Sequence, residues 1–134
     1  MATVELEIPS KSAYVGVVRL ALASLGRAAG MDEGAVDDLK IAISEACANA
    51  VLSNQQKGVD APIEVGWTNE TGRLVVEVGD RGVVYDPLTV DPSDTQSLRL
   101  SMSVALLQSL VDDCEFVPRP GGGMCTRLAV NLVA

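Results

Sequence analysis

The sequence predicts an α/β two-layer sandwich, in which a mixed, mainly antiparallel sheet carries helices on one face. The first observation is the order of periodic segments, β-α-α-β-β-loop-α-β-β, which lacks the strand–helix alternation of a parallel sheet. The second is composition: 48% of the residues are hydrophobic but only 3% are aromatic, so Val, Leu, Ile and Ala must build the core. The third is length, since 134 residues suit one domain, which we expect to span residues 1–134.

The first half of the chain predicts one strand and two helices. Residues 4–8 alternate apolar and polar side chains, which is the pattern of a half-buried strand. Ser10 or Ser12 can cap a helix that extends to about Ala29, where a glycine follows. A second helix should extend from residue 33 or 34 to residue 53.

The second half of the chain predicts four strands and one helix. Residues 69–72 have the length of a hairpin loop and separate the first two of these strands. Residues 80–97 are rich in glycine, proline, acids and small polar residues, so we expect an irregular segment there. In chain order, the expected elements are strands at 63–68 and 73–79, a helix at 98–111, and strands at 114–117 and 125–133.

The charge of the chain disfavours nucleic acids and membranes as partners. Lys and Arg number 10 against 18 Asp and Glu, which gives a net charge of -8. Nucleic-acid binding depends on basic residues that neutralise phosphates, so we expect no direct nucleic-acid contact and a basic partner protein instead. The chain shows no signal-peptide pattern and no run of about 18 apolar residues, so we expect a cytoplasmic protein without a membrane span.

The absence of histidine limits the chemistry that the chain can perform. It excludes Ser-His-Asp and Cys-His catalysis, His-ligated zinc and autophosphorylation on histidine. Any proton transfer must therefore use a carboxylate. Cys47, Cys114 and Cys125 are odd in number and lack CxxC spacing, so we interpret them as small core residues in a reducing compartment.

The second expected helix carries the first candidate site. Glu45 and Asn49 are four residues apart, so they stack on one side of the helix, among unusually apolar neighbours. Glu45 could act as a general base, and Asn49 could offer an oxygen to a hard cation such as Mg2+. The alternative is a solvated Glu/Asn pair on a helix surface. The opposite, core-facing side comprises Val36, Leu39, Ile43, Ala46, Cys47, Ala50 and Val51.

The end of the strand at 73–79 carries the second candidate site. Asp80 leaves the sheet with a short side chain that could accept a hydrogen bond from an adenine amino group. Gly82 would let the backbone approach a ligand closely. The alternative is a simple Asp-x-Gly turn. Residues 121–123 are all glycine, but no helical pattern follows them, so a hairpin connection is favoured over a phosphate-binding loop.

Taken together, these segments resemble a known family. The sequence ISEACANAV at 43–51, followed by DRG at 80–82, LVDDCEF at 110–116 and GG at 122–123, is similar to the anti-sigma factor serine kinases of bacterial sporulation and stress control. These kinases are GHKL (Bergerat-fold) ATPases. The resemblance covers nearly the whole chain in the same order.

The resemblance implies a function and a set of site residues. It implies that ATP or ADP binds with Mg2+, that Glu45 is the catalytic base, that Asn49 binds the magnesium, and that Asp80 and Gly82 form the adenine side. It implies a kinase that holds a sigma factor inactive and phosphorylates a serine on a STAS-domain anti-sigma factor antagonist. Kinases of this family are commonly dimers, so a homodimer is also implied.

The chain departs from the family pattern where phosphates should bind. The glycine-rich lid motif is replaced by RLSMS at residues 99–103, in which Ser101 and Ser103 keep their N–H groups for phosphates and add hydroxyls. Val84 stands for a second glycine after Asp80, and Met124 stands for a threonine.

These departures leave two alternatives open. Asp86, Asp91 and Asp94 lie in the expected lid, where they would repel phosphate. One alternative is therefore a pseudokinase: the same scaffold as a binding module, with weak or no ATP hydrolysis or with a different nucleotide. The other is a stand-alone GHKL domain with a partner other than a sigma factor.

Overall fold

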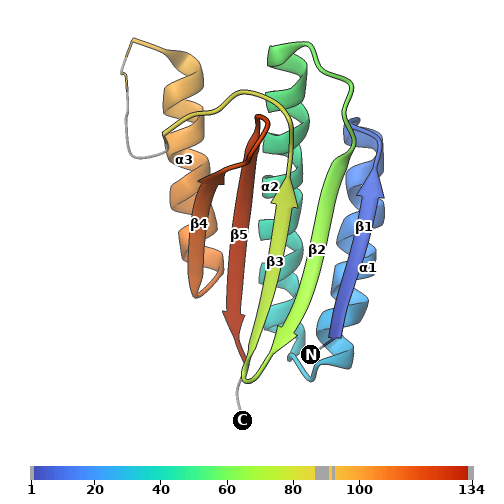
Figure 1. The fold of residues 1–134 in the computed structure, drawn as a ribbon. Coiled ribbons are helices and arrows are strands. Elements are labelled where there is room, and N and C mark those ends of the chain that lie inside the picture. Colours follow the sequence, from blue (N-terminus) through green and yellow to red (C-terminus); the bar gives the residue numbers. More distant parts are fainter. Residues whose placement is uncertain (1, 87–90, 92, 133–134) are drawn as a thin grey trace.

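The computed structural model describes residues 2–86, 91 and 93–132. Within these residues, strands and helices follow one another in the order that the sequence predicts (Figure 1). In chain order they are β1 (Ala2–Ile8), the short 3-10 helix η1 (Ser12–Tyr14), α1 (Val15–Ala28), α2 (Glu33–Lys57), β2 (Ile63–Glu70), β3 (Arg73–Gly79), α3 (Thr95–Leu110), β4 (Asp113–Pro118) and β5 (Met124–Asn131).

The strands form one five-stranded sheet in the order β1-β2-β3-β5-β4. Each of its four neighbouring pairs is antiparallel, so the described strands show no parallel pairing that would make the sheet mixed. The three helices lie together on one side of the sheet, behind it in Figure 1. The predicted α/β two-layer sandwich with helices on one face is confirmed.

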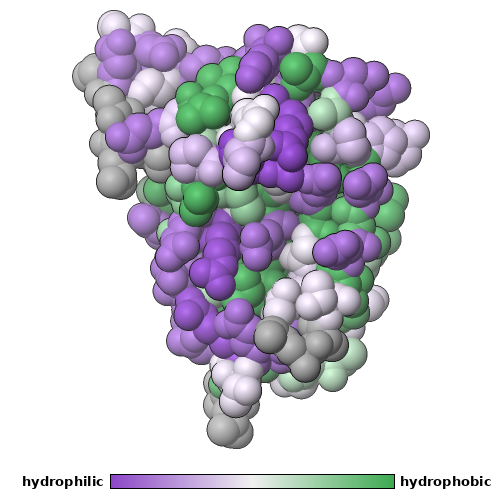
Figure 2. Space-filling model, viewed as in Figure 1, coloured by the Kyte–Doolittle hydropathy of each residue, from purple (hydrophilic) through white to green (hydrophobic). Residues whose placement is uncertain are grey.

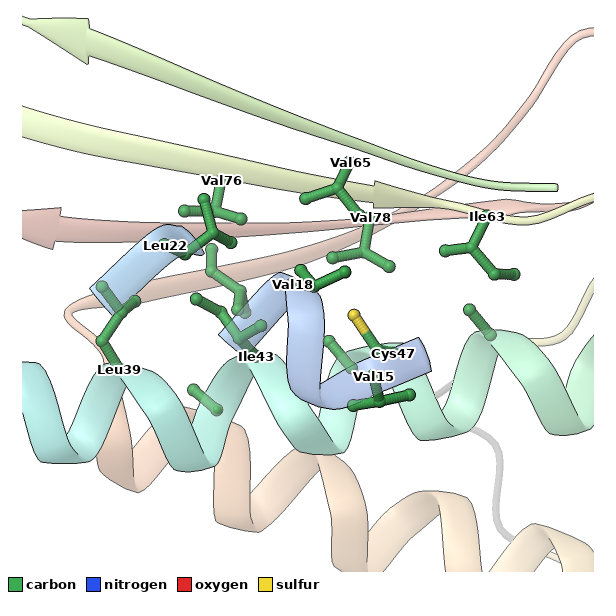
Figure 3. Close-up of a cluster of buried hydrophobic side chains, with 14 of the residues drawn as sticks. Val15, Val18, Leu22, Leu39, Ile43, Cys47, Ile63, Val65, Val76 and Val78 are labelled. Carbon is green, nitrogen blue, oxygen red and sulfur yellow. The ribbon is translucent and has the colours of Figure 1, made fainter. Parts of the chain in front are cut away.

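The core lies between the sheet and the helix layer. Figure 3 shows Val18 of α1 and Ile43 of α2 on the helix side of this layer and Val76 and Val78 of β3 opposite them. All four side chains are buried. The predicted core face of α2 is confirmed, because each of its seven residues is buried: Val36, Leu39, Ile43, Ala46, Cys47, Ala50 and Val51.

The other face of the sheet is open and polar. Figure 2, viewed from this side, shows hydrophilic side chains over the strands. Along β1, Glu5 and Glu7 are exposed, whereas Ile8 is buried and Leu6 packs against the core. This is the alternation that predicted a half-buried strand, since neighbouring residues of a strand point to opposite faces.

Helix α2 extends four residues beyond the predicted end at Ser53. It begins at the N-cap Asp32, whose side chain accepts a hydrogen bond from the N–H of Ala35, and ends at Gly58 with a left-handed φ of 73°. The polar sequence at its end resembles a loop, but Asn54 is buried. The Asn54 Nδ2 donates to the carbonyl of Ala61 at 3.0 Å, which ties the last turns of the helix to the chain that follows.

Helix α3 begins three residues before the predicted start at residue 98. Asp94 is the N-cap, because its side chain accepts a hydrogen bond from the N–H of Gln96 at 3.0 Å. Part of the segment expected to be irregular is therefore helical. Residues 87–90 and 92 of that segment lie outside the described residues.

The three cysteines are free thiols. Cys47 is a core residue as predicted, and burial raises the pKa of its thiol to about 12. Cys114 and Cys125 are only half-buried, so the prediction of core positions is wrong for them: β4 is an edge strand, and Cys125 alternates with the buried residues Met124 and Thr126 and so points to the open face of the sheet. Among the described residues, no helix has both the length and the apolar character that crossing a membrane requires.

Candidate functional site

A pocket of about 440 Å³ opens between α2, the segment after β3 and the first turns of α3. Small-molecule pockets commonly measure roughly 300–1,000 Å³, so this one suits a ligand of nucleotide size or smaller. The residues that line it are Asn49, Ser53 and Gln56 from α2, Val83, Tyr85 and Asp86 after β3, and Asp94, Gln96, Ser97, Arg99 and Leu100 at the start of α3.

Asn49 is buried in the pocket wall, and both ends of its amide are engaged. The Nδ2 donates to the hydroxyl of Ser103 at 2.6 Å, and the Oδ1 accepts from the Arg99 Nη1 at 3.0 Å. Both partners belong to α3. The amide therefore links α2 to α3, and its oxygen faces a guanidinium.

Asp80 lies at the end of β3, and its side chain is 5% exposed. Its Oδ1 accepts from the N–H groups of Gly82 at 2.9 Å and Met124 at 3.1 Å. Among the described residues, no donor bonds its Oδ2. Burial raises the pKa of this carboxyl, and the two N–H bonds oppose that rise. The pocket-lining residues do not include Asp80 itself.

The turn after Asp80 packs directly on α2. A Cβ atom at Gly82 would overlap the backbone carbonyl of Ser53, so only glycine fits there. The hydroxyl of Ser53 accepts from the N–H of Val83 at 2.8 Å, and the Oδ1 of Asn54 accepts from the N–H of Arg81 at 2.9 Å. These contacts with α2 fix the position of the turn relative to the helix.

The glycine directly before β5 supports the same turn from the other side. Gly123 has a φ of +90°, and a Cβ atom there would overlap the carbonyl of Asp80. The three glycines at 121–123 all have positive φ and join β4 to β5, which confirms the predicted hairpin connection. Its last glycine also allows the close approach that holds Asp80.

Ser101 and Ser103 lie inside α3 rather than at its start. Because the helix begins at Thr95, only the N–H groups of its first turn lack partners within the helix. The N–H groups of both serines belong to the helical ladder, so they are not free for phosphates as the sequence suggested. Ser103 is buried against Asn49, whereas Ser101 is half-buried and does not line the pocket.

Glu45 does not share the pocket with Asn49. It is half-buried and lines a separate hollow beside Arg19, Lys40 and Ser44, between α1 and the first half of α2. The structure therefore brings Asn49 next to Ser103 and Asp80 next to Gly82, and it leaves Glu45 one helical turn away from Asn49.

The residues around Asn49 do not fit a magnesium ion. Within the described part of the chain, no three acidic, cysteine or histidine side chains converge, so a magnesium ion here would depend on the Asn49 oxygen together with water and phosphates of the ligand. The one amide oxygen expected to bind the metal accepts a hydrogen bond from the positively charged Arg99. A second cation at that oxygen would be repelled by the guanidinium.

Sequence reasoning gave no role to Arg99 or Ser53. A signal for each was present in the helical spacing: Ser53 is four residues after Asn49, and Arg99 is four residues before Ser103, so each pair shares a helix face. Tyr85 was also missed as a lining residue. Burial raises the pKa of its hydroxyl to about 12, so it enters the pocket as a neutral donor.

A protein-family model covers most of the chain. The model of the histidine kinase-like ATPase domain matches residues 8–130. The chain belongs to this family. It is 32% identical to the serine-protein kinase RsbW of Bacillus pumilus over 88% of this chain and 80% of that protein. It is also 32% identical to RsbW of Listeria monocytogenes, over 82% of this chain and 76% of that protein. The likeness to the anti-sigma factor kinases is thus confirmed at the level of the family.

Two solved structures share the fold of this family member. One contains the RsbU and RsbW domains of Rv1364c from Mycobacterium tuberculosis; it matches with a TM-score of 0.72 at 20% identity and covers 100% of this chain and 35% of that one. The other is the SiaB–SiaC complex of Pseudomonas aeruginosa, which matches with a TM-score of 0.58 at 16% identity and covers 95% of this chain and 88% of that one. At these identities, the two structures support the fold alone.

Proposed function

We propose that this chain is an anti-sigma factor of the serine-kinase type, which sequesters a sigma factor and is countered by a STAS-domain antagonist. The observation that carries the proposal is the 32% identity to serine-protein kinase RsbW over 88% of the chain. The net charge of -8 supports a basic surface on the partner. A cytoplasmic location and a homodimer remain part of this proposal.

The proposed ligand of the site is an adenine nucleotide, ATP or ADP. The geometry at the end of β3 supports this choice. Asp80 has one carboxylate oxygen tied to two backbone N–H groups and one without a protein donor, and that second oxygen can accept from an adenine amino group. Because residue 82 is glycine, the backbone after Asp80 can pack closely against α2. The pocket next to this turn has room for the remainder of a nucleotide.

The proposed reaction is transfer of the γ-phosphoryl group of ATP to a serine of the antagonist. Glu45 would take the proton of the serine hydroxyl while the serine oxygen bonds to the γ-phosphorus and the bond to the ADP oxygen breaks. Arg19 and Lys40 line the same hollow as Glu45 and Asp37, so a polar segment of the antagonist would meet both signs of charge there.

A second candidate is the same binding module without phosphoryl transfer. The observation that favours it is the engagement of Asn49 by Arg99 and Ser103, which places a guanidinium against the amide oxygen that a metal would need. The first turn of α3 is also a poor phosphate site, because Asp94 caps it with a negatively charged carboxylate.

Two measurements on the same protein separate these candidates. Co-purification with the sigma factors of the host tests sequestration, and transfer of radiolabelled phosphate from ATP to a STAS-domain protein tests catalysis. Sigma-factor binding together with phosphate transfer supports the anti-sigma kinase. Sigma-factor binding without phosphate transfer supports the binding module that lacks catalysis. If no sigma factor co-purifies, the central proposal is wrong.

A further inference from the structure

We infer that the guanidinium of Arg99 takes the place of the divalent cation in the pocket, so that an adenine nucleotide binds here without magnesium. This inference rests on the proposed nucleotide binding. At that site, the Arg99 guanidinium would neutralise the charge of the phosphates. The starting observation is the hydrogen bond from the Arg99 Nη1 to the Asn49 Oδ1, the oxygen that would otherwise be the metal ligand.

The charges around the pocket give Arg99 this role. Among the described lining residues, Arg99 is the only one with a positive charge, and Asp86 and Asp94 are negative. A phosphate group that enters the pocket therefore meets one fixed cation there. Arginine suits the task because its planar guanidinium can donate two parallel hydrogen bonds to a phosphate.

The guanidinium also has donors to spare. Its Nη1 is bonded to Asn49, but its Nε is buried and meets no acceptor among the described residues. A buried donor without an acceptor is costly, so native proteins rarely leave one unmatched. A phosphate oxygen of a bound ligand would satisfy it once the side chain turns this atom toward the pocket, while the Asn49 amide holds the Nη1 end of the guanidinium.

Asn49 then becomes a positioning residue instead of a metal ligand. Its amide is fixed at its other end by the hydroxyl of Ser103 at 2.6 Å, so its oxygen is turned toward Arg99. Ser103 and Arg99 are one turn apart on the same face of α3. Ser103 and Asn49 thus hold Arg99 in place, and its single positive charge lies where a magnesium ion would place two.

Calorimetric titration of the whole chain with ADP tests the inference. Wild type should bind ADP in EDTA and in excess Mg2+ with affinities that agree within about threefold. Arg99→Gln should lose about tenfold or more of the affinity in EDTA, because a charged hydrogen bond to phosphate is removed. Part of that loss should return with Mg2+, because the Asn49 oxygen is then free.

Arg127→Gln is the matched control. It removes the same charge from the open face of the sheet, where Arg127 lies 3.8 Å from Glu70 and from Glu115, away from the pocket. It should bind ADP as wild type does. Thermal unfolding of both variants checks that they are folded, and the comparison of EDTA with Mg2+ on wild type does not depend on any variant.

The outcomes separate this inference from the proposal beneath it. If wild type binds ADP only with Mg2+, or if Arg99→Gln binds as well as Arg127→Gln in EDTA, the cation role of Arg99 is wrong and the nucleotide site stands. If wild type binds no adenine nucleotide under either condition, both the inference and the proposed nucleotide site are wrong.

Discussion

The contact between Gly82 and α2 permits a sharp test of how the site is built. Replacing Gly82 by alanine adds one methyl group that overlaps the backbone carbon and oxygen of Ser53. Ordinary van der Waals contact begins at 3.4 Å, so the turn and the helix must separate by about 1 Å. Both sides are backbone, so neither can rotate out of the way as a flexible side chain could.

The cost follows from what this separation breaks. The N–H of Val83 would lose the hydroxyl of Ser53, and the N–H of Arg81 would lose the side chain of Asn54. Overpacking costs about 1–3 kcal/mol, and a fully buried donor left unpaired costs about 1–3 kcal/mol more. Both donors here are only partly buried, so water can meet part of that second cost. We therefore expect Gly82→Ala to lower the free energy of unfolding by about 3–5 kcal/mol and the melting temperature by roughly 10–20 °C.

Gly66→Ala is the matched control, measured by urea denaturation and thermal unfolding of both variants. Gly66 lies in β2, has no positive φ, and a Cβ atom there meets nothing within 4 Å. Alanine at this position should change stability by less than about 1 kcal/mol, in the stabilising direction, because it restricts the unfolded chain. If the two variants prove equally stable, the close approach of the turn to α2 does not constrain this protein.

Further predictions concern single side chains of the site. Asp80→Asn should stay folded, since its side-chain oxygen can still accept from two N–H groups, but should bind ADP about tenfold more weakly in calorimetry. Burial raises the pKa of Asp80 above its ordinary 3.8, so the folded chain holds this proton more tightly than the unfolded chain. As the pH rises from below 3.8, wild type should therefore lose stability relative to Asp80→Asn in urea denaturation; parallel profiles would contradict this. Glu45→Gln should still co-purify with its sigma factor, while phosphoryl transfer falls about 100- to 10,000-fold; unchanged transfer would exclude Glu45 as the base. Ser103→Ala should weaken the binding of ATP more than that of adenosine, because the Asn49 amide loses the hydroxyl that fixes it and Arg99 is held less firmly toward the phosphates; equal losses for both ligands would contradict this positioning role.

The parts of the fold set by local patterns could be predicted from the sequence. The alternation at residues 4–8, the core face of α2 and the glycine hairpin at 121–123 each depend on neighbours within a few positions. Such patterns report directly which side of an element is buried. The limits of α2 and α3 were not predicted correctly in this way. The end of α2 depends on Asn54, whose partners Ala61 and Arg81 become visible only in the fold. The start of α3 depends on a local cap, Asp94 to Gln96, whose signal was present in the sequence but was not used.

In the candidate site, too, local contacts could be predicted from the sequence and long-range contacts could not. Asp80 and Gly82 are two residues apart, and the hydrogen bond between them follows from the sequence of a short turn. Glu45 and Asn49 are four apart on one helix, but the fold places them in different hollows because α1 lies beside one and α3 beside the other. Spacing on a helix gives the face of a residue; it does not identify the element that covers that face.

Asn49 shows why the chemistry of a motif residue depends on what stands opposite it. An asparagine oxygen can bind a cation or accept from a guanidinium, and the helix that carries Asn49 is compatible with both. The choice is made fifty residues away, where α3 begins early enough to bring Arg99 within 3.0 Å of that oxygen. A guanidinium there supplies positive charge while excluding a second cation. The same amide can therefore ligate a metal or position an arginine, and in this chain it contacts the arginine.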